Sequence, residues 1–320
     1  MASIIRAALL FLAAAHAATI QHVTDTLDNN PTSVGFYLYV PDKLAPRPAI
    51  LVNPHSCHGS AQAAYAGSQF AAFADKYGFV VIYPDSPHQE DKCWDVSSKE
   101  TLSHNGGGDS RGIVSMVDYA LAKYNGDRGR VFVTGVSSGA MMTSVLVGAY
   151  PDVFAAGSAY SGVPFSCFRA PESLQSSSNG SRFGYWNADC ATGKVTKTAA
   201  AWAADIANAY PGYCGWRPKM QIFHGTADET LNYTCFTEEV KQWNAVFGFS
   251  QTPTSVVANT PKANWTRSVY GHSRSGKNWF EAYSAGGVTH NIEHQDQLTL
   301  DWFDLACNTT AGGCFRWGDK

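Results

Sequence analysis

The sequence predicts an α/β fold built on a mostly parallel central sheet with helices on both faces. Short apolar runs rich in Val, Ile, Phe or Tyr alternate along the chain with segments whose apolar residues have helical spacing. Strands that alternate with helices are joined by crossovers, which makes neighbouring strands parallel and covers both faces of the sheet. The chain has 320 residues, 45% of them hydrophobic, and can therefore bury a sizeable core.

Seven apolar runs are predicted to form strands. Most of them end at Gly, Pro or Ser, residues that interrupt regular structure. Short runs that are apolar on both faces are typical of buried strands in a parallel sheet. The predicted strands are residues 34–40, 49–53, 79–83, 131–134, 155–160, 220–224 and 279–283.

Six segments between these runs are predicted to be helices. Segment 113–124 illustrates the pattern, because its apolar residues recur at intervals that place them on one helical face. The predicted helices are residues 61–77, 113–124, 140–150, 199–210, 238–247 and 297–306.

Two further segments, 170–198 and 250–276, lack periodicity, and the first is rich in Ser, Asn and Gly. Both are predicted to be loop excursions. Neither has the length or composition of a linker between domains. A single catalytic domain over residues 18–320 is therefore expected.

The first 17 residues, MASIIRAALLFLAAAHA, have the features of a secretory signal peptide. Arg6 supplies a short basic region, residues 7–15 supply an apolar stretch, and residues 15–17 form an A-x-A cleavage site. The stretch is too short to span a bilayer, and no later segment is long and apolar enough. We therefore expect a secreted, extracellular protein that begins near Ala18.

The cysteines and the N-x-S/T sequons fit that compartment. An even number of cysteines in a secreted chain indicates disulfides, and the absence of any C-x-x-C pair argues against a structural zinc site. Pairing nearest neighbours gives 57–93, 167–190, 214–235 and 307–314, although sequence leaves the connectivity open. The disulfide candidates are Cys57, Cys93, Cys167, Cys190, Cys214, Cys235, Cys307 and Cys314. The candidate glycan acceptors are Asn179, Asn232, Asn264 and Asn308.

The charge of the chain restricts its partners. The formal net charge is −3, and no block of Lys or Arg stands out. Neither nucleic acid nor an anionic membrane is therefore an expected partner. The 9 Trp and 15 Tyr would suit a neutral polar substrate such as a polysaccharide, although most of these rings are expected in the core.

Residues 131–143, VFVTGVSSGAMMT, contain the pattern G-x-S-x-G between a predicted strand and a predicted helix. This is the nucleophile elbow, in which a sharp turn exposes the central Ser at the edge of the sheet. The flanking glycines are needed because neighbouring backbone comes close to them. Ser137 is the central residue, and Ser138 would offer its backbone N–H to a developing oxyanion.

The acid of a catalytic triad is expected after a later strand, because the chain order in this arrangement is Ser, Asp or Glu, His. Residues 219–228, KMQIFHGTAD, contain an apolar strand, a His-Gly turn and then Asp228. Asp228 would orient the imidazole and stabilise the imidazolium. Glu229 is the alternative acid. A purely structural alternative makes Asp228 the cap of the next helix.

The base is expected after the next strand, where SAGGVTH leads the chain to His290. The same segment contains H-x-x-E-H at His290, Glu293 and His294, an inverted zinc-protease pattern. That pattern requires a further ligand downstream, usually Glu, and no Glu follows Glu293. The two glycines before it are also unfavourable inside a helix. We therefore expect His290 to be a general base and no metal to be involved.

Taken together, these motifs resemble carbohydrate esterase family 1, and especially its acetylxylan esterases. The resemblance runs over nearly the whole mature chain. It rests on SCHGSAQ (56–62), GFVVIYPDSP (78–87), CWDVSS (93–98), HNGGGDS (104–110), VFVTGVSSGAMMT (131–143), YSGVPFSCF (160–168), KMQIFHGTAD (219–228) and GGVTHNI (286–292). It implies an α/β-hydrolase fold, a triad of Ser137, Asp228 and His290, no cofactor, and removal of acyl groups from plant cell-wall xylan.

The resemblance also implies further site residues. It places the first oxyanion loop at residues 53–59, where the backbone N–H of Cys57 would pair with that of Ser138. The family has an aromatic residue where this chain has Ser56, so the shape of the acyl pocket is open. Trp94 and Asp95 are candidate substrate-binding residues, and the alternative is a structural role around Cys93.

The expected function is that of a secreted serine carboxylic ester hydrolase, an acetylxylan esterase, acting as a monomer on acylated xylan or a related polysaccharide. A feruloyl esterase or a polyester depolymerase of the same fold is the alternative among enzymes. An alternative of another class is a non-catalytic binding module, which is disfavoured because all three triad positions are filled.

Overall fold

The computed structural model describes residues 19–175, 183–273, 276–307 and 313–318. In these residues one sheet has the strand order β1-β2-β4-β3-β5-β6-β7-β10-β9-β8. The strands from β4 to β10 in this order are parallel, whereas β1, β2, β9 and β8 pair antiparallel at the two edges. The strands are β1 Gln21–His22, β2 Gly35–Tyr39, β3 Ile50–Val52, β4 Val80–Asp85, β5 Val131–Val136, β6 Ala156–Tyr160, β7 Lys219–Gly225, β8 Ser255–Ala258, β9 Trp265–Tyr270 and β10 Phe280–Ala285.

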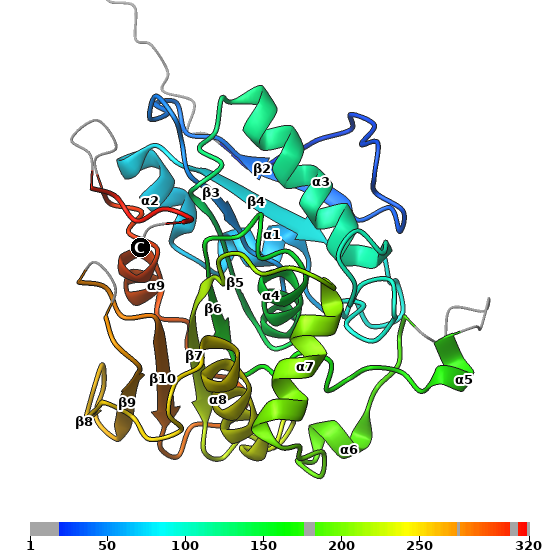
Figure 1. The fold of residues 1–320 in the computed structure, drawn as a ribbon. Coiled ribbons are helices and arrows are strands. Elements are labelled where there is room, and N and C mark those ends of the chain that lie inside the picture. Colours follow the sequence, from blue (N-terminus) through cyan, green and yellow to red (C-terminus); the bar gives the residue numbers. More distant parts are fainter. Residues whose placement is uncertain (1–18, 176–182, 274–275, 308–312, 319–320) are drawn as a thin grey trace, which may run out of the picture.

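Helices cover both faces of this sheet (Figure 1). The helices are α1 Ala61–Ala66, α2 Phe70–Tyr77, α3 Gly108–Lys123, α4 Ser138–Ala149, α5 Glu172–Gln175, α6 Ala188–Ala191, α7 Ala199–Ala209, α8 Thr234–Phe247 and α9 Asp296–Trp302. Strand β3 shows how the faces divide: Ile50 and Val52 pack into the core under α3, α4, α7 and α8, and Leu51 packs into the core under α1, α2 and α9. This arrangement confirms the predicted layers.

All seven predicted strands form, but one predicted helix is interrupted. Segment 61–77 folds as α1 and α2, because Ser68 and Gln69 leave the helical hydrogen-bond pattern. The Ser68 hydroxyl donates to the carbonyl of Ala64 at 2.9 Å, and the Gln69 N–H donates to Asp296 at 2.7 Å. The predicted helix at 297–306 is also shorter than expected and ends at Trp302.

The expectation of a loop over residues 250–276 is wrong. This segment forms β8 and β9, which extend the sheet next to β10. Every residue of β8 is exposed, so the strand lacks the alternation that marks a half-buried strand in sequence. Segment 170–198 contains only the short helices α5 and α6 among its described residues.

Three of the four nearest-neighbour disulfides form, namely 57–93, 167–190 and 307–314. The fourth is wrong: Cys214 is exposed and Cys235 is buried, and neither is bridged. Cys214 precedes β7 and Cys235 follows it, and this seven-residue strand spans about 20 Å. The Cys235 thiol instead donates to the carbonyl of Cys190 at 3.3 Å.

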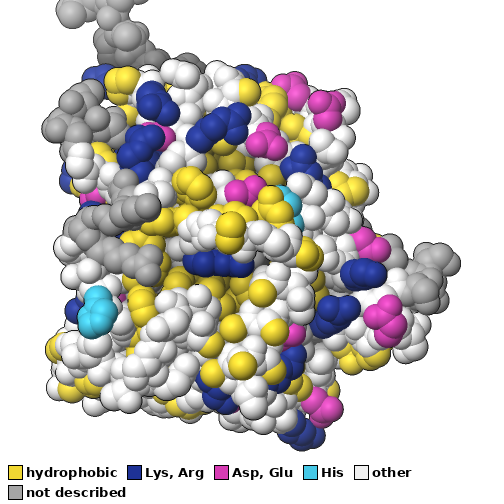
Figure 2. Space-filling model, viewed as in Figure 1, with side chains coloured by type: hydrophobic (Ala, Val, Ile, Leu, Met, Phe, Trp, Pro, Cys, Tyr) yellow, Lys and Arg dark blue, Asp and Glu magenta, His cyan; other side chains and the backbone are white. Residues whose placement is uncertain are grey.

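The surface features expected of a secreted chain are partly visible. The sequons at Asn232 and Asn264 are exposed, whereas those at Asn179 and Asn308 and the proposed signal peptide lie outside the described residues. Helices long and apolar enough to cross a bilayer do not occur in the described ranges. On the face drawn in Figure 2, basic and acidic side chains lie interspersed.

Candidate active site

The G-x-S-x-G segment forms the predicted sharp turn between β5 and α4. Ser137 has φ of 56° and ψ of −121°, a left-handed conformation that non-glycine residues rarely adopt. A Cβ on Gly139 would lie 2.1 Å from the carbonyl oxygen of Pro54, and one on Gly135 would lie 2.6 Å from that of Gly139. The close approach expected at both glycines is therefore present, and it holds Ser137 in its strained conformation.

Asp228 lies three residues beyond the end of β7, and its side chain is inaccessible to solvent. Its Oδ1 accepts the backbone N–H groups of Thr230 at 2.9 Å and Leu231 at 2.7 Å. Helix α8 begins later, at Thr234, so Asp228 does not cap it. Although burial raises it, hydrogen bonds from His224, His290 and the Leu231 N–H hold the pKa of Asp228 below its ordinary value.

His290 follows β10, the strand that pairs in parallel with β7. Its Nδ1 donates to Asp228 Oδ2 at 2.8 Å, and its Nε2 lies 2.9 Å from Ser137 Oγ. The structure thus brings together the three residues predicted from the sequence. Glu229, the alternative acid, accepts the backbone N–H of His290 at 3.2 Å and does not contact its ring.

The loops that carry the acid and the base are joined by backbone contacts. The Ala227 N–H donates to the carbonyl of Val288 at 3.0 Å, and the Gly287 N–H donates to the Thr226 hydroxyl at 2.8 Å. Gly225 allows this approach, because a Cβ there would lie 2.2 Å from the Val288 carbonyl oxygen. The two loops therefore form one unit that fixes Asp228 relative to His290.

Cys57 and Ser138, whose backbone N–H groups are the predicted oxyanion donors, line the same cavity as Ser137. Neither N–H donates to another group in the part of the chain that the structure describes. Preorganised donors of this kind can hold a negatively charged oxygen next to the nucleophile. The Cys57–Cys93 disulfide fixes one donor, and the N-terminus of α4 fixes the other.

Trp94 braces both donor segments, a role that the sequence did not reveal. Its backbone N–H donates to Ser138 Oγ at 2.8 Å, and its indole N–H donates to the carbonyl of His55 at 2.7 Å. His55 is itself fixed, because the Ser86 N–H donates to its Nε2 at 3.0 Å. Burial lowers the pKa of His55, which favours the unprotonated Nε2 that this bond requires.

The cavity over Ser137 has a volume of about 560 Å³. Trp94 lines it, as expected. One rim is aromatic, and most of it comes from segment 170–198, which was predicted only as a loop. Its residues are Phe183, Tyr185 and Trp186 from that segment, together with Phe168. The side chain of Trp186 packs edge-on against Phe168 and remains 49% exposed, so it is open to a substrate.

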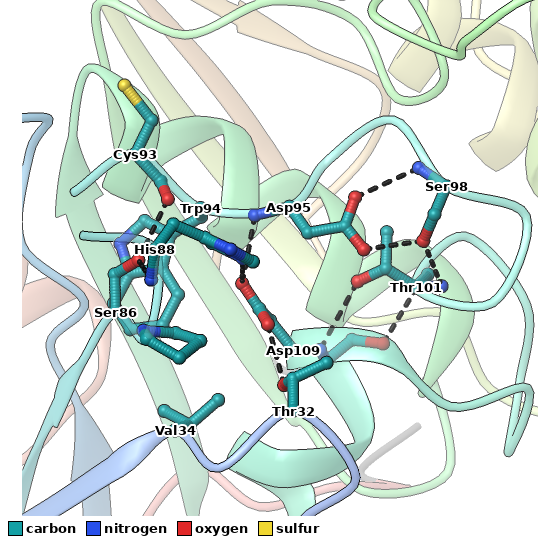
Figure 3. Close-up of polar contacts among 12 residues, drawn as sticks. Thr32, Val34, Ser86, His88, Cys93, Trp94, Asp95, Ser98, Thr101 and Asp109 are labelled. Atoms are coloured by element: carbon teal, nitrogen blue, oxygen red, sulfur yellow. Dashed lines mark hydrogen bonds and ion pairs between the residues drawn. The ribbon is translucent and has the colours of Figure 1, made fainter. Parts of the chain in front are cut away.

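Asp95, the other candidate substrate-binding residue, is wholly buried and is not among the residues that line the cavity; its polar contacts are drawn in Figure 3. Its carboxylate turns toward Ser98, accepting the Ser98 N–H at 2.9 Å and the hydroxyl at 2.5 Å. Its own N–H donates to Asp109, which also accepts from Thr32 and His88. Asp95 therefore contacts the loop that carries Trp94 and does not reach the cavity, which corrects the expectation of substrate binding.

Among the described residues, Glu293 and His294 have different polar partners, and none of these partners is a triad residue. Glu293 is paired with Lys262. His294 contacts Asp296 at 2.6 Å and Thr134 at 2.9 Å. The H-x-x-E-H pattern therefore does not fold into one site. Clusters of three or more potential metal ligands do not occur within the described ranges.

Comparison with known proteins identifies the relatives of this chain. Residues 34–231 match the model of the family described as esterase PHB depolymerase. Acetylxylan esterase A of Emericella nidulans is 47% identical over 285 residues, which cover 89% of this chain and 88% of the relative. Acetylxylan esterase A of Aspergillus oryzae is 46% identical over 90% of this chain and 89% of its own length.

Solved structures give the same result. The acetyl xylan esterase from Aspergillus awamori has a TM-score of 0.82 and 42% identity, covering 90% of this chain and all of the other. The S-formylglutathione hydrolase FrmB from Staphylococcus aureus, at a TM-score of 0.51 and 15% identity, shares the fold. These matches confirm the resemblance predicted from the motifs. The chain belongs to the esterase PHB depolymerase family of α/β-hydrolase carboxylic ester hydrolases, together with these fungal acetylxylan esterases.

Proposed function

We propose that this protein is an extracellular acetylxylan esterase that uses Ser137, His290 and Asp228 as a catalytic triad. One observation carries the proposal: Ser137 Oγ, the His290 ring and the Asp228 carboxylate form an unbroken chain of contacts of 2.9 and 2.8 Å, and Ser137 and His290 line a cavity. This geometry supports nucleophilic attack by a hydroxyl that is activated by a neighbouring base.

In the first half of the reaction, His290 Nε2 takes the proton of Ser137 as Oγ attacks the ester carbonyl. The N–H groups of Cys57 and Ser138 hold the resulting oxyanion. The intermediate collapses to an acyl-enzyme, and the leaving sugar oxygen receives the proton from His290. Asp228 holds the imidazole in the tautomer with a free Nε2 and stabilises the imidazolium.

In the second half, His290 removes a proton from a water molecule that attacks the acyl-enzyme. The second oxyanion uses the same two donors and collapses to release the carboxylic acid and restore Ser137. No redox step or bound metal is needed, because each proton that His290 accepts is returned within the same half of the reaction.

The acyl group and the substrate are the finer part of the proposal. The names of the relatives support acetyl groups on xylan, and the exposed Trp186 on an aromatic rim is suited to stacking on a sugar ring. The matching family model is described as an esterase PHB depolymerase, so hydrolysis of a polyester is a second candidate activity. The three disulfides support an extracellular location.

Ser137→Ala should abolish turnover, because it removes the attacking atom and leaves the fold intact. A loss of about 10³-fold or more in kcat is expected on acetylated xylan. Ser103→Ala is a matched control, since this hydroxyl contacts only the Lys99 carbonyl on the surface. Full activity of Ser137→Ala would rule out the triad. Initial rates on acetylated xylan, a feruloylated arabinoside and a polyester film would rank the three ester classes.

A further inference from the structure

The carboxylate of Asp228 contacts a second imidazole besides that of His290. His224 Nε2 lies 3.2 Å from Asp228 Oδ2, the same oxygen that accepts from His290 Nδ1 at 2.8 Å. His224 belongs to β7, is completely buried and does not line the cavity. It therefore has no access to substrate, and any effect on the reaction passes through Asp228.

The contacts of His224 determine which nitrogen carries the proton. Its Nε2 also lies 2.8 Å from the carbonyl oxygen of Leu231, an atom that can only accept. The ionised carboxylate of Asp228 can likewise only accept. The hydrogen must therefore lie on Nε2, which is hydrogen-bonded to the Leu231 carbonyl and in contact with Asp228 Oδ2. His224 Nδ1 meets no hydrogen-bond partner among the described residues, so the polar contacts of the ring in that part of the chain all involve Nε2.

This donor restrains the acid in two ways. It contacts Oδ2 directly, on the oxygen that faces the base. It also holds the Leu231 carbonyl, while the Leu231 N–H donates to Oδ1 at 2.7 Å. Without His224, only the two backbone donors on Oδ1 and the His290 ring itself would position the carboxylate. The carboxylate could then rotate about its own bond and pull the imidazole away from Ser137.

We propose that His224 is a positioning residue of the triad, which holds Asp228 Oδ2 toward His290. The inference rests on the proposed function, because it assumes that Asp228 orients the general base. It adds a fourth side chain to the machinery, one that never contacts substrate. A purely structural role would instead stabilise the fold without affecting turnover selectively.

A pair of near-isosteric substitutions separates these roles. In His224→Gln, the side-chain amide can place an N–H close to the position of Nε2, whereas His224→Met fills similar space and has no donor. The Met variant should lose about 10- to 100-fold in kcat, the worth of one hydrogen bond to a charged group, with KM unchanged. The Gln variant should recover most of that loss. Rates on a soluble acetyl ester provide both constants, and thermal unfolding compares the stabilities.

The inference fails if the Met variant keeps the wild-type kcat, or if Gln and Met lose equal activity. If the Met variant does not fold, His224→Asn replaces it, because the shorter amide cannot reach the two oxygens. Ser137→Ala distinguishes a failure of the proposed triad from a failure of the role given to His224. An active Ser137→Ala would overturn the triad itself, whereas an inactive Ser137→Ala with a fully active His224→Met would overturn only the role of His224.

Discussion

Two buried carboxylates lie close to the cavity, and their environments drive their protonation in opposite directions. Asp228, in the loop after β7, has its pKa held below the ordinary value by hydrogen bonds that outweigh the effect of burial. Asp95, in the loop behind Trp94, has its pKa raised to about 7 by burial and by the charge of Asp109. Both residues are buried from solvent, so burial alone does not decide the charge.

The difference comes from the neighbours of each carboxylate, because Asp95 accepts hydrogen bonds from Ser97 and Ser98 but lies beside a second acid, Asp109. Four N–H groups reach Asp228, two of them from imidazoles, so the acid loop stabilises a negative charge. Around Asp95, the His88 ring, the Thr32 hydroxyl and the Asp95 N–H all donate to Asp109. Burial and the charge of Asp109 therefore raise the pKa of Asp95. The carboxylate of the proposed triad contacts two imidazoles, whereas Asp95 lies beside a second acid.

Asp228→Asn should have the largest effect. The amide can donate to His290 Nδ1 and favour the wrong tautomer, in which Nε2 carries the proton and cannot act as a base. A fall of roughly 10⁴-fold in kcat is expected, measured on a soluble acetyl ester. Asp95→Asn is the matched control, because a neutral amide resembles the protonated acid. Equal losses in the two variants would contradict the contrast between the regions.

Gly225→Ala should have the next largest effect, by pushing apart the two loops of the acid region. The new Cβ would lie 2.2 Å from the Val288 carbonyl oxygen, so the His290 loop must shift. A displacement of about 1 Å in catalytic geometry can cost roughly 10²-fold in kcat. Gly212→Ala is the control: its positive φ of 79° strains an alanine, but a Cβ there meets nothing within 4 Å and the strain lies outside the acid and base loops. Unchanged kcat in Gly225→Ala would mean that the loops adjust independently.

The acid region could be predicted from sequence because its signals are local and ordered. The elbow at Ser137 is a five-residue pattern, and each triad partner follows an apolar strand in a fixed chain order. His224 stands in the same motif as Asp228, four residues earlier. Its position could be read from the sequence, but its contact with the carboxylate depends on how the turn closes.

The surroundings of Asp95 could not be predicted in the same way, because they depend on packing between distant segments. Asp95 and Asp109 are 14 residues apart, and Thr32 reaches the same carboxylate from 77 residues away. Nothing local distinguishes an acid that lines a cavity from one that does not. The exposed strand β8 was missed for a related reason, since no buried face imposes a pattern on its sequence.

The smallest expected effect is on the free energy of unfolding, through the buried carboxylate of Asp95, and not on turnover. In the folded protein the pKa of Asp95 is about 7, whereas an unfolded Asp titrates near ~3.9. The native state therefore binds a proton that the unfolded state releases. This contribution to stability is fully present below about pH 4 and is lost as the pH rises to about 7.

Asp95→Asn removes that titration and keeps a neutral side chain that can donate to Ser98. The free energy of unfolding of the variant, measured by urea titration, should therefore improve relative to wild type between pH 5 and pH 8. His88 and Asp109 face the same cluster and remain in both proteins. An equal difference at both pH values would mean that Asp95 is charged in the folded state. The two carboxylates would then have the same charge, and the acid beside Asp95 would no longer distinguish it from Asp228.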